Sequence, residues 1–598
     1  MKKTLNNLLR ILGALLICYA VYRVFDLTLL NIIPLLAAAQ FLIFLPGKEE
    51  IRPAVIRTAG TVSAVLGLLT AFARYGVIAR SVFIVNFLTA LVCGFALGLA
   101  LFPAIATVYS RLSEGGKPQQ IRQRAGAVFG LSFLVIAAVW AVFFLIFYPG
   151  IAGEDAFWQL AQGLGTEPLS NHHPVAHTLI ISFLFRTGLA LFGTANAAAA
   201  FLSVCQMILL DLCWSFAVSR LYRLGFRPAL WIGSLVFFAL APCNIIFAFS
   251  VHKDPWFAAA FTVFGAVLLE IVCDPDAGKA RRVLRVVLLS ISALGVGLLR
   301  SNGKFVLIVL LPFVLIRFLR SRRAVWIVTA AAAVLSFVIT GPVYNAAGVT
   351  PVDTVEYLSI PLQQIARVYT DGGSASAEDD GLIREVVPVE MIPAHYYPKI
   401  SDNIKNLIRD QGDQELISEN KLTYLGVWLR LLVRNPDAYI EAYVDQTVGF
   451  WYPDSAGQPY LTKSTPNDLG VESEPLLPAG FYSVLATWVD GIRAVPLLGF
   501  LYSNGLTAWL MILLLGLAVL RKSDLTVLFV PPFVLWLTLL VSTPVYSDNR
   551  YMYPVFVFLP PLFAASAGNG SAAPVFRAGG ERRPGQGRIF RRGDTEEN

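Results

Sequence analysis

The stretch between Gly153 and Leu179 places carboxylate and imidazole side chains directly after a long apolar segment. It holds the adjacent Glu154 and Asp155, and later the pair His172 and His173. A carboxylate can act as a general base, and imidazoles can orient a phosphate or bind a divalent cation. Ionisable groups at membrane depth are functional candidates. Asp155 is therefore the first candidate for a catalytic base, with Glu154 as a solvated neighbour.

Three further polar groups interrupt apolar segments later in the chain, beginning at His252, Arg300 and Asp548. Their cations could stabilise the charge that develops on a departing phosphate. With one carboxylate, they predict transfer of a group from a lipid phosphate. The residues expected to contact the phosphate are His172, His173, Lys253, Arg300 and Arg550. Further site candidates are Glu154, His252, Asp254, Asn302, Asp548 and Trp451. Arg300 is equally well explained as a helix-end arginine that extends to the membrane surface.

These residues lie in a strongly apolar chain of 598 residues. Hydrophobic side chains make up 56% of it and charged ones only 14%, whereas about 25% is usual in soluble proteins. Runs of about 20 apolar residues, long enough to cross about 30 Å of hydrocarbon, recur along the sequence. The pattern predicts an all-α polytopic membrane protein of about 14 transmembrane helices in the cell membrane. The predicted spans are 8–26, 28–46, 55–73, 82–104, 126–148, 195–219, 228–249, 256–273, 283–300, 304–320, 324–345, 496–520, 525–545 and 551–567.

The distribution of Lys and Arg predicts the orientation, because basic residues near span ends collect in the cytoplasm. The basic clusters are 111–124, 220–227, 279–285, 317–323 and 521–522. All of them lie on one side only if the apolar segment 174–192 does not cross the membrane. We therefore expect an interfacial helix at 174–192 and two cytoplasmic termini. The polar groups around Asp155, Lys253, Arg300 and Arg550 then share the extracytoplasmic face.

The polar region 349–490 carries 21 Asp and Glu against 9 Lys and Arg, although the whole chain has a formal net charge of +8. An acidic domain outside and basic loops inside fit the same rule. The basic balance therefore reflects membrane orientation, and we expect no nucleic-acid partner. Helical patterns appear around 401–411 and 415–434 and again before Trp451. The Trp451 ring is expected to anchor at the membrane surface or to stack on a sugar.

An ordered string of motifs runs through residues 126–567: "YPGIAGEDAFWQL", "SNHHPVAHTL", "HKDPWF", "RSNGK", "SIPLQQIARVY", "GFWYP" and "SDNRYMYP". It resembles an uncharacterised bacterial family of multispanning proteins related to the GT-C glycosyltransferases, a superfamily that includes the protein O-mannosyltransferases. The resemblance implies a GT-C-like fold and a polyprenyl-phosphate-linked sugar donor. It also implies that Asp155 is the catalytic Asp of an external loop, 149–173, and that 174–192 is the interfacial helix after it.

Two features depart from the superfamily pattern. The catalytic loop follows the fifth predicted span instead of the first, which leaves 1–110 as an added four-helix module of unknown role. Glu154 and Asp155 are adjacent and do not form a spaced two-acid motif. No cofactor is therefore certain, and a divalent metal stays open.

The sequence thus predicts an integral membrane glycosyltransferase. It would move a sugar from a polyprenyl-phosphate donor to an envelope glycan, lipid or protein outside the cytoplasm, with inversion. Its partners would be the donor, membrane lipid and the envelope acceptor. Two alternatives are a transporter or flippase of lipid-linked sugars and a non-enzymatic membrane protein that binds envelope polymers. The predicted regions are the module 1–110, the GT-C-like core 126–348, the mostly helical acidic domain 349–490, the helices 496–567 and a disordered basic cytoplasmic tail, 568–598.

Overall fold

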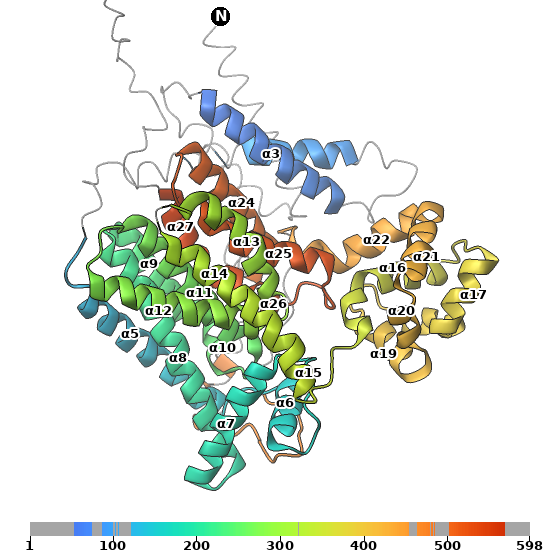
Figure 1. Ribbon diagram of the computed structural model, residues 1–598, viewed down its shortest axis with the longest axis horizontal. Helices are drawn as coiled ribbons and strands as arrows, with labels where there is room; N and C mark the ends of the chain where they lie inside the picture. Colours follow the sequence, from blue (N-terminus) through green and yellow to red (C-terminus); the bar gives the residue numbers. More distant parts are fainter. Residues whose placement is uncertain are drawn as a thin grey trace, which may run out of the picture.

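The structure is a computed structural model. It describes residues 53–73, 87–99, 102, 106, 121–320, 322–453, 463–478, 480, 481, 483, 484 and 502–567. Helices dominate this part of the chain (Figure 1), and extended backbone pairs within it only as isolated bridges. The predicted spans 8–26 and 28–46 and the tail 568–598 lie outside the described residues. The all-helical prediction is confirmed for the residues that the structure describes.

Five described helices are long and apolar enough to cross a membrane. They are α5 (Ala125–Phe147), α7 (Val175–Phe192), α8 (Ala195–Arg223), α11 (Lys253–Cys273) and the continuous segment Arg323–Ala346, formed by α14 (Arg323–Val338), a π-helical turn (Ile339–Val343) and α15 (Tyr344–Ala346). A sixth span results if α9 (Pro228–Leu240) and α10 (Pro242–Phe249) count as one, although they are bent by 52°. Within the described residues the structure therefore supports five or six spans by this measure, whereas twelve of the fourteen expected spans lie wholly or partly in that part of the chain.

The other predicted spans in the described region form helices that do not meet this measure of length and composition. These helices are α3 (Pro53–Ala73), Phe87–Leu99, α12 (Lys279–Leu298), α13 (Gly303–Phe318), α24 (Asn504–Leu520), α25 (Val530–Val541), α26 (Asn549–Val557) and α27 (Leu559–Ala567). Proline accounts for one clear break. Pro242 has no amide hydrogen and disfavours helical backbone in Ala241, so the expected span 228–249 divides there.

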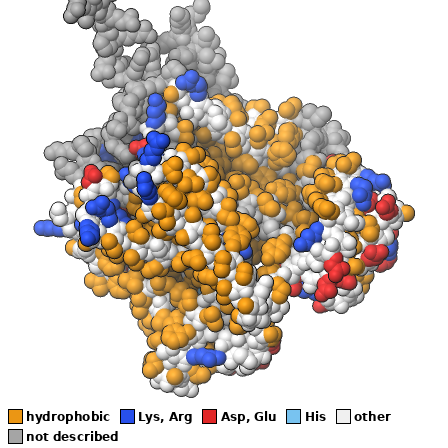
Figure 2. Space-filling model, in the orientation of Figure 1, with side chains coloured by type: hydrophobic (Ala, Val, Ile, Leu, Met, Phe, Trp, Pro, Cys, Tyr) orange, Lys and Arg blue, Asp and Glu red, His pale blue; other side chains and the backbone are white. Residues whose placement is uncertain are grey.

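Four of the predicted basic clusters meet at one end of the helical body. Arg223 and Arg285 both pair with Asp274. Arg317 pairs with Asp524 at 2.9 Å, and Arg521 donates to the carbonyl of Ala567 at 3.1 Å. We call this the basic end of the body, and Lys and Arg side chains are visible along the upper left of Figure 2.

α7 starts and finishes away from the basic end, although its length and composition would allow it to cross. The amide of Arg122 donates to the carbonyl of Arg223 at 2.9 Å, so α5 begins and α8 ends at the basic end. α6 (Glu154–Leu164) and α7 connect these two helices at their opposite end. α8 has 29 residues and is about 44 Å long, so its first turns can extend beyond a 30 Å hydrocarbon layer beside α7. This is the geometry that the expected interfacial helix requires.

The face of the body that Figure 2 shows is largely apolar, with hydrophobic side chains in orange. Leu134 of α5, Ile291 of α12 and Val334 of α14 are exposed, and Ile316 of α13 is 86% exposed. Soluble monomers rarely expose so large a contiguous apolar area. The described helices therefore present the surface expected of a protein in a lipid bilayer.

Residues 349–453 form a smaller helical unit, which we call the polar domain (right side of Figure 1). Its helices are α16 (Ser359–Thr370), α17 (Ala377–Val386), α18 (Ile392–His395), α19 (Asp402–Gln411), α20 (Gln414–Glu419), α21 (Lys421–Arg434) and α22 (Pro436–Thr447). A separate core that includes Val355, Ile404 and Leu431 holds them together. The helical patterns expected at 401–411 and 415–434 correspond to α19 and to α20 with α21.

The sequence placed the segment 463–478 in one region, 349–490, with the polar domain. In the structure this segment returns to the loop that precedes α6. The amide of Thr465 donates to the carbonyl of Ala152 at 3.0 Å, and that of Glu474 to Tyr148 at 2.9 Å. The separate core of the polar domain reaches Tyr439, whereas the last residues of the unit, Phe450, Trp451 and Tyr452, pack in the core of the body. The segment 463–478 covers the end of the body opposite the basic end.

Candidate functional site

The loop before α6 is fixed in place by a close approach to α8. Gly150 has a φ of +130°, and a Cβ atom at this position would lie 2.0 Å from the Ser203 hydroxyl oxygen. Only glycine fits such a conformation and such a contact. Ile151 then forms a parallel bridge with Ser250, in which its amide donates to Phe249 and its carbonyl accepts from Val251. The loop that carries Asp155 is thereby joined to the loop that carries Lys253.

The second loop is held from inside the body by a buried amide. The Gln206 side chain of α8 donates to the carbonyls of Phe247, Ala248 and Ser250, at 2.8–3.3 Å. Its oxygen accepts from the Trp256 indole at 2.8 Å. These bonds satisfy the carbonyl groups that the break between α10 and α11 leaves unpaired. The start of α11, and Lys253 with it, is therefore rigidly placed.

Asp155 lies in the first turn of α6 and contacts Arg550 of α26. Its Oδ2 is 3.2 Å from Arg550 Nη1, and its Oδ1 is 3.9 Å from His173 Nε2. Arg550 is held in turn by Asp548, whose carboxylate accepts from the Arg550 Nε at 2.9 Å and from its backbone amide at 2.9 Å. The Asp155 side chain is 42% exposed, so this carboxylate is supported from within and open on one side.

Lys253 completes the group through His173. Its Nζ is 2.8 Å from His173 Nδ1. An ammonium group can only donate, so Nδ1 accepts this bond, and the hydrogen of the neutral ring is on Nε2, which faces Asp155. We call Asp155, His173, Lys253, Asp548 and Arg550 the carboxylate cluster. Its members come from four segments that are far apart in the sequence.

The electrostatics of the cluster favour an ionised carboxylate beside neutral imidazoles. Burial alone would raise the pKa of Asp155, but the charges of Lys253 and Arg550 outweigh it and hold this pKa well below its usual value. Burial and the Lys253 charge hold the pKa of His173 well below 6.5. Burial, together with the Arg550 charge, lowers the pKa of the nearby His252 to about 4. Neither His173 nor His252 is therefore charged at neutral pH.

Arg300 does not face the open side of the cluster. It is buried, its Nη1 lies 2.9 Å from the buried Asp254 and 3.3 Å from the Tyr551 carbonyl, and its guanidinium stacks over the Tyr551 ring. The structure thus places Arg300 as a brace between α11 and α26. This differs both from the expected phosphate contact and from an arginine that extends to the membrane surface.

His172 connects the cluster to the polar domain. Its Nδ1 is 4.0 Å from Glu356, and the Trp158 ring packs against both His172 and His173 at 5.5 Å. Glu356 is itself held by Lys405, at 3.0 Å, and by Arg409. Burial lowers the pKa of His172. Nothing in the sequence pointed to Glu356, because its partner is 184 residues away and no motif joins them.

The polar domain also contacts the segment that leads to Arg550. The Tyr546 amide donates to the Lys399 carbonyl at 2.8 Å, and the Ser401 amide donates to Pro544 at 2.9 Å. Ser547 then adopts a left-handed conformation, with φ of 49°, and its carbonyl accepts from the Asn504 side chain at 3.0 Å. The domain thereby touches two of the segments that form the carboxylate cluster.

The remaining sequence candidates lie around the cluster or away from it. Glu154 is exposed, and His252 is buried at the start of α11. The Asn302 amide donates to the Thr538 hydroxyl at 2.9 Å. Trp451 is a core residue, because it is only 3% exposed and its indole donates to Thr447. Neither the expected surface anchor nor sugar stacking fits this buried ring.

A divalent metal does not fit the donor set of the cluster. Among the described residues no group of three His, Cys, Asp or Glu side chains is arranged to hold a metal ion. Two of the atoms that could bind one are already engaged by cations, since His173 Nδ1 accepts from Lys253 and Asp155 Oδ2 pairs with Arg550. The cluster is instead suited to an anion, which the Lys253 and Arg550 side chains could share with the carboxylate.

Comparison with known proteins yields one match. No curated protein and no solved structure is significantly similar to the chain. A family model matches residues 164–573, so that His173, Lys253 and Arg550 lie inside the matched region and Asp155 lies just before it. The model's description, Family of unknown function (DUF6020), assigns no activity. Because the match covers more than half of the sequence, the chain belongs to the DUF6020 family.

Proposed function

We propose that this protein is an integral membrane glycosyltransferase that uses a polyprenyl-phosphate-linked sugar. The observation that carries the proposal is the position of Asp155, an ionised and partly exposed carboxylate between Arg550 and the His173–Lys253 pair. A general base and two cations at one point match the needs of sugar transfer from a lipid phosphate. The resemblance of the motifs to GT-C enzymes supports the same interpretation.

The reaction assigned to the cluster is a single displacement. The acceptor hydroxyl oxygen attacks the anomeric carbon, the bond from that carbon to the phosphate oxygen breaks, and its electron pair remains on the phosphate. Asp155 accepts the proton of the attacking hydroxyl. Lys253 and Arg550 stabilise the negative charge that develops on the departing phosphate. One displacement inverts the anomeric configuration and needs no covalent intermediate.

The low pKa of Asp155 gives donor binding a role in the chemistry. In the free protein, Lys253 and Arg550 stabilise the carboxylate and make it a weak base. A donor phosphate that binds these cations weakens their electrostatic stabilisation of the Asp155 carboxylate. The pKa of Asp155 then rises toward its usual value, because each cation is shared with a second anion. The base becomes effective only when the donor is in place.

The two ends of the body give the proposed topology. We assign the basic end to the cytoplasm, and the carboxylate cluster with the polar domain to the extracytoplasmic side of the cell membrane. A transporter would instead need polar residues near the bilayer midplane. Most charged groups of the described helices gather at the two ends of the body, with Asp211, buried in the middle of α8, as an exception, and this favours an enzyme at the membrane surface over a translocation pathway.

Complementation of a deletion strain tests the proposal and identifies the sugar in the same experiment. Mass spectrometry of envelope glycans, lipids and exported proteins should reveal a sugar that the deletion removes and the wild-type gene restores. Asp155→Asn keeps the size of the side chain and removes the base, so it should lower transfer by about 10²–10⁴. The variant should still accumulate in the membrane.

The matched control is Glu154→Gln, which removes the neighbouring exposed carboxylate. It should restore the missing sugar as well as the wild-type gene does. Full restoration by Asp155→Asn, at equal protein level, would exclude Asp155 as the base. An envelope unchanged by deletion of the gene would argue against glycosyl transfer itself.

A further inference from the structure

Helix α21 of the polar domain has two apolar faces. One face packs into the core of the domain through Val427 and Leu431, which are buried. The other face exposes Leu422, Leu425, Leu429 and Val433, and the first and last of these are 84% and 81% exposed. Spacings of three and four residues place these four side chains in one stripe along the helix. A helix on the surface of a soluble domain normally turns polar residues outward.

The charge of α21 also differs from that of the rest of its domain. The helix contains Lys421, Arg430 and Arg434 and no acidic residue, whereas the region 349–490 has 21 acidic against 9 basic residues. Basic and exposed apolar residues on one helix are typical of helices that lie in the interface of anionic membranes. The protein's own candidate spans place a lipid surface next to this domain.

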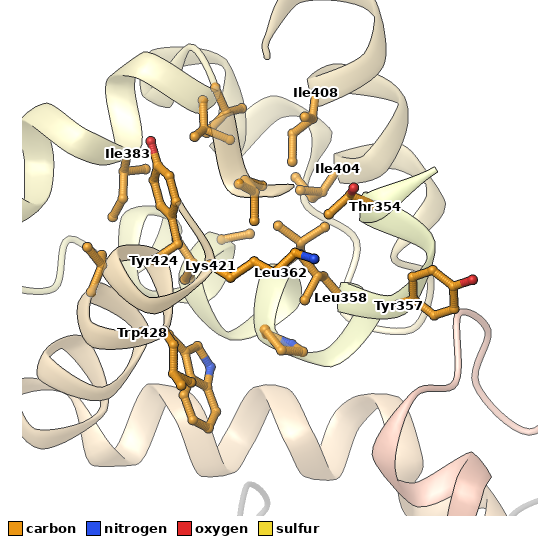
Figure 3. Close-up of a pocket in the computed structure, with 18 of the residues that line it drawn as sticks. Thr354, Tyr357, Leu358, Leu362, Ile383, Ile404, Ile408, Lys421, Tyr424 and Trp428 are labelled. Atoms are coloured by element: carbon orange, nitrogen blue, oxygen red, sulfur yellow. The ribbon is translucent and has the colours of Figure 1, made fainter. Parts of the chain in front are cut away.

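An apolar cavity of about 520 Å³ lies directly behind α21 (Figure 3). Its walls include Leu358, Leu362, Ile383, Ile404 and Ile408. Two wall residues, Trp428 and Tyr424, use their polar atoms in hydrogen bonds within the domain. The Trp428 indole donates to Gln364, and the Tyr424 hydroxyl donates to the Leu382 carbonyl. The cavity is thus lined by carbon, and its volume is within the range of small-molecule sites.

The cavity and the exposed stripe meet. Leu425 belongs to both, and the exposed Tyr357 also lines the cavity. In Figure 3 the Lys421 side chain runs from α21 along the wall, and its amine ends close to Leu358 and Thr354. No ion pair or hydrogen bond engages this amine within the described part of the chain. An apolar space is therefore bordered by one available cation and by an apolar surface.

We propose that this cavity binds the hydrocarbon chain of an anionic lipid, which enters from the membrane surface on which the α21 stripe rests. The tail would lie among Leu362, Ile404 and Ile408, and the anionic head group would pair with Lys421. A soluble ligand would not require the stripe, and a neutral lipid would not require the cation. The site is separate from the carboxylate cluster and does not depend on the proposed glycosyl transfer.

Photolabelling of the full-length protein in lipid nanodiscs tests this site. Two probes carry a photoreactive group in the tail, one on phosphatidylglycerol and one on a polyprenyl phosphate. Labelled peptides from residues 354–428 are expected with at least one probe. The probe that labels this region shows whether the bound hydrocarbon chain comes from a membrane phospholipid or from an isoprenoid carrier. If neither probe labels it, the proposal is overturned.

Variants separate the cavity from the surface of the domain. Leu362→Trp fills the cavity, and labelling should fall about tenfold, as expected when a few methylene groups lose their apolar contacts. Asp410→Trp adds the same ring at an exposed position outside the cavity and should label like the wild type. Equal labelling of Leu362→Trp and the wild type, at an unchanged unfolding temperature, would contradict the proposal.

A second variant remains informative if Leu362→Trp does not fold. Lys421→Glu changes only an exposed side chain, and it should reduce labelling by the anionic probes without affecting a phosphatidylcholine probe. An unchanged preference for anionic probes would overturn the role of Lys421 and with it the proposal. Asp155→Asn should label like the wild type, so failure of this site and failure of the glycosyltransferase proposal give different results.

Discussion

The two ends of the helical body both carry buried charge, but they arrange it in different ways. At the basic end, Arg223 and Arg285 enclose Glu270 and Asp274, whose side chains are 2% and 5% exposed. At the other end, Asp155 pairs with Arg550 and is 42% exposed, and its second oxygen faces only the distant His173. One arrangement is closed to solvent. The other keeps a carboxylate available to a ligand.

This difference distinguishes a structural role from the chemical role that we propose. A closed network of buried charges fixes helix positions, because removal of any member leaves a partner unpaired. An open carboxylate among cations stabilises the fold less and can exchange its partners for an incoming anion. Perturbed pKa values alone would not distinguish the two, since ion-pair networks also shift them. Exposure and the unshared oxygen make the distinction.

The largest expected effect concerns which end of the body faces the cytoplasm, because a topology reporter gives an all-or-none signal. A reporter inserted in the turn at Gly372–Gly373 should be extracytoplasmic, and one fused after Ala567 should be cytoplasmic. The reason is the collection of Lys and Arg at the basic end. If both reporters lie on the same side, or if their sides are reversed, the assignment of the two ends to the two sides of the membrane is wrong.

The next largest effect concerns the cations of the carboxylate cluster. Lys253→Met and Arg550→Gln should each lower transfer by about 10²–10³, because each removes a preorganised charge from the departing phosphate. The measurement is restoration of the missing sugar, normalised to inserted protein. Lys304→Met is the control, since Lys304 lies near Thr340 instead of the cluster. Near-normal transfer by both cluster variants would rule out their role.

Disruption of the closed network should change stability without changing the chemistry. Glu270→Gln leaves two buried arginines with one carboxylate and should lower the free energy of unfolding by about 3–5 kcal/mol. Transfer per folded molecule should remain unchanged. The matched control is Asp524→Asn, which breaks an exposed pair at the same end and should cost about 1 kcal/mol or less. Thermal unfolding in detergent measures both, and similar losses would contradict the comparison.

A smaller effect is expected from pH. The folded protein keeps His252 neutral down to pH of about 4, whereas an unfolded chain takes up this proton below about 6.5. The unfolded state therefore binds more protons in this window, and stability should fall as pH drops from 6.5 toward 4, by about 1.4 kcal/mol per pH unit for this group. His252→Gln should flatten the dependence of the unfolding temperature on pH. Parallel curves for variant and wild type would refute this assignment.

The sequence predicted those features that depend on residues close together in the chain. The helical class, the basic clusters and the helices α19 to α22 of the polar domain could be predicted from the sequence, whereas α16, α17 and α18 were not. The polar groups around Asp155, Lys253 and Arg550 stood out because ionisable residues are rare beside apolar segments. The structure brings these three together, while their chemical roles stay predictions.

Other features depend on contacts that no local pattern contains. The sequence counted 228–249 as one span, although Pro242 was a visible signal for the break at Ala241. It could not reveal that Glu356 approaches His172, or that Asp254 engages Arg300, because these partners lie on segments that are far apart in the sequence. Trp451 was placed at a surface because tryptophan is common there, whereas packing with the Trp509 indole, which donates to the Trp451 carbonyl, holds it in the core.

The long sequence separation between Asp155 and Arg550 has a consequence for biosynthesis. The two residues are 395 positions apart, and Arg550 and Asp548 follow nearly all of the other described helices. During translation, Asp155 and Lys253 are therefore made long before the arginine that pairs with the carboxylate. The cluster can be assembled only after α26 has been synthesised and placed, so a partly made or truncated chain lacks it. The proposed chemistry would therefore require a chain that has been synthesised through α26.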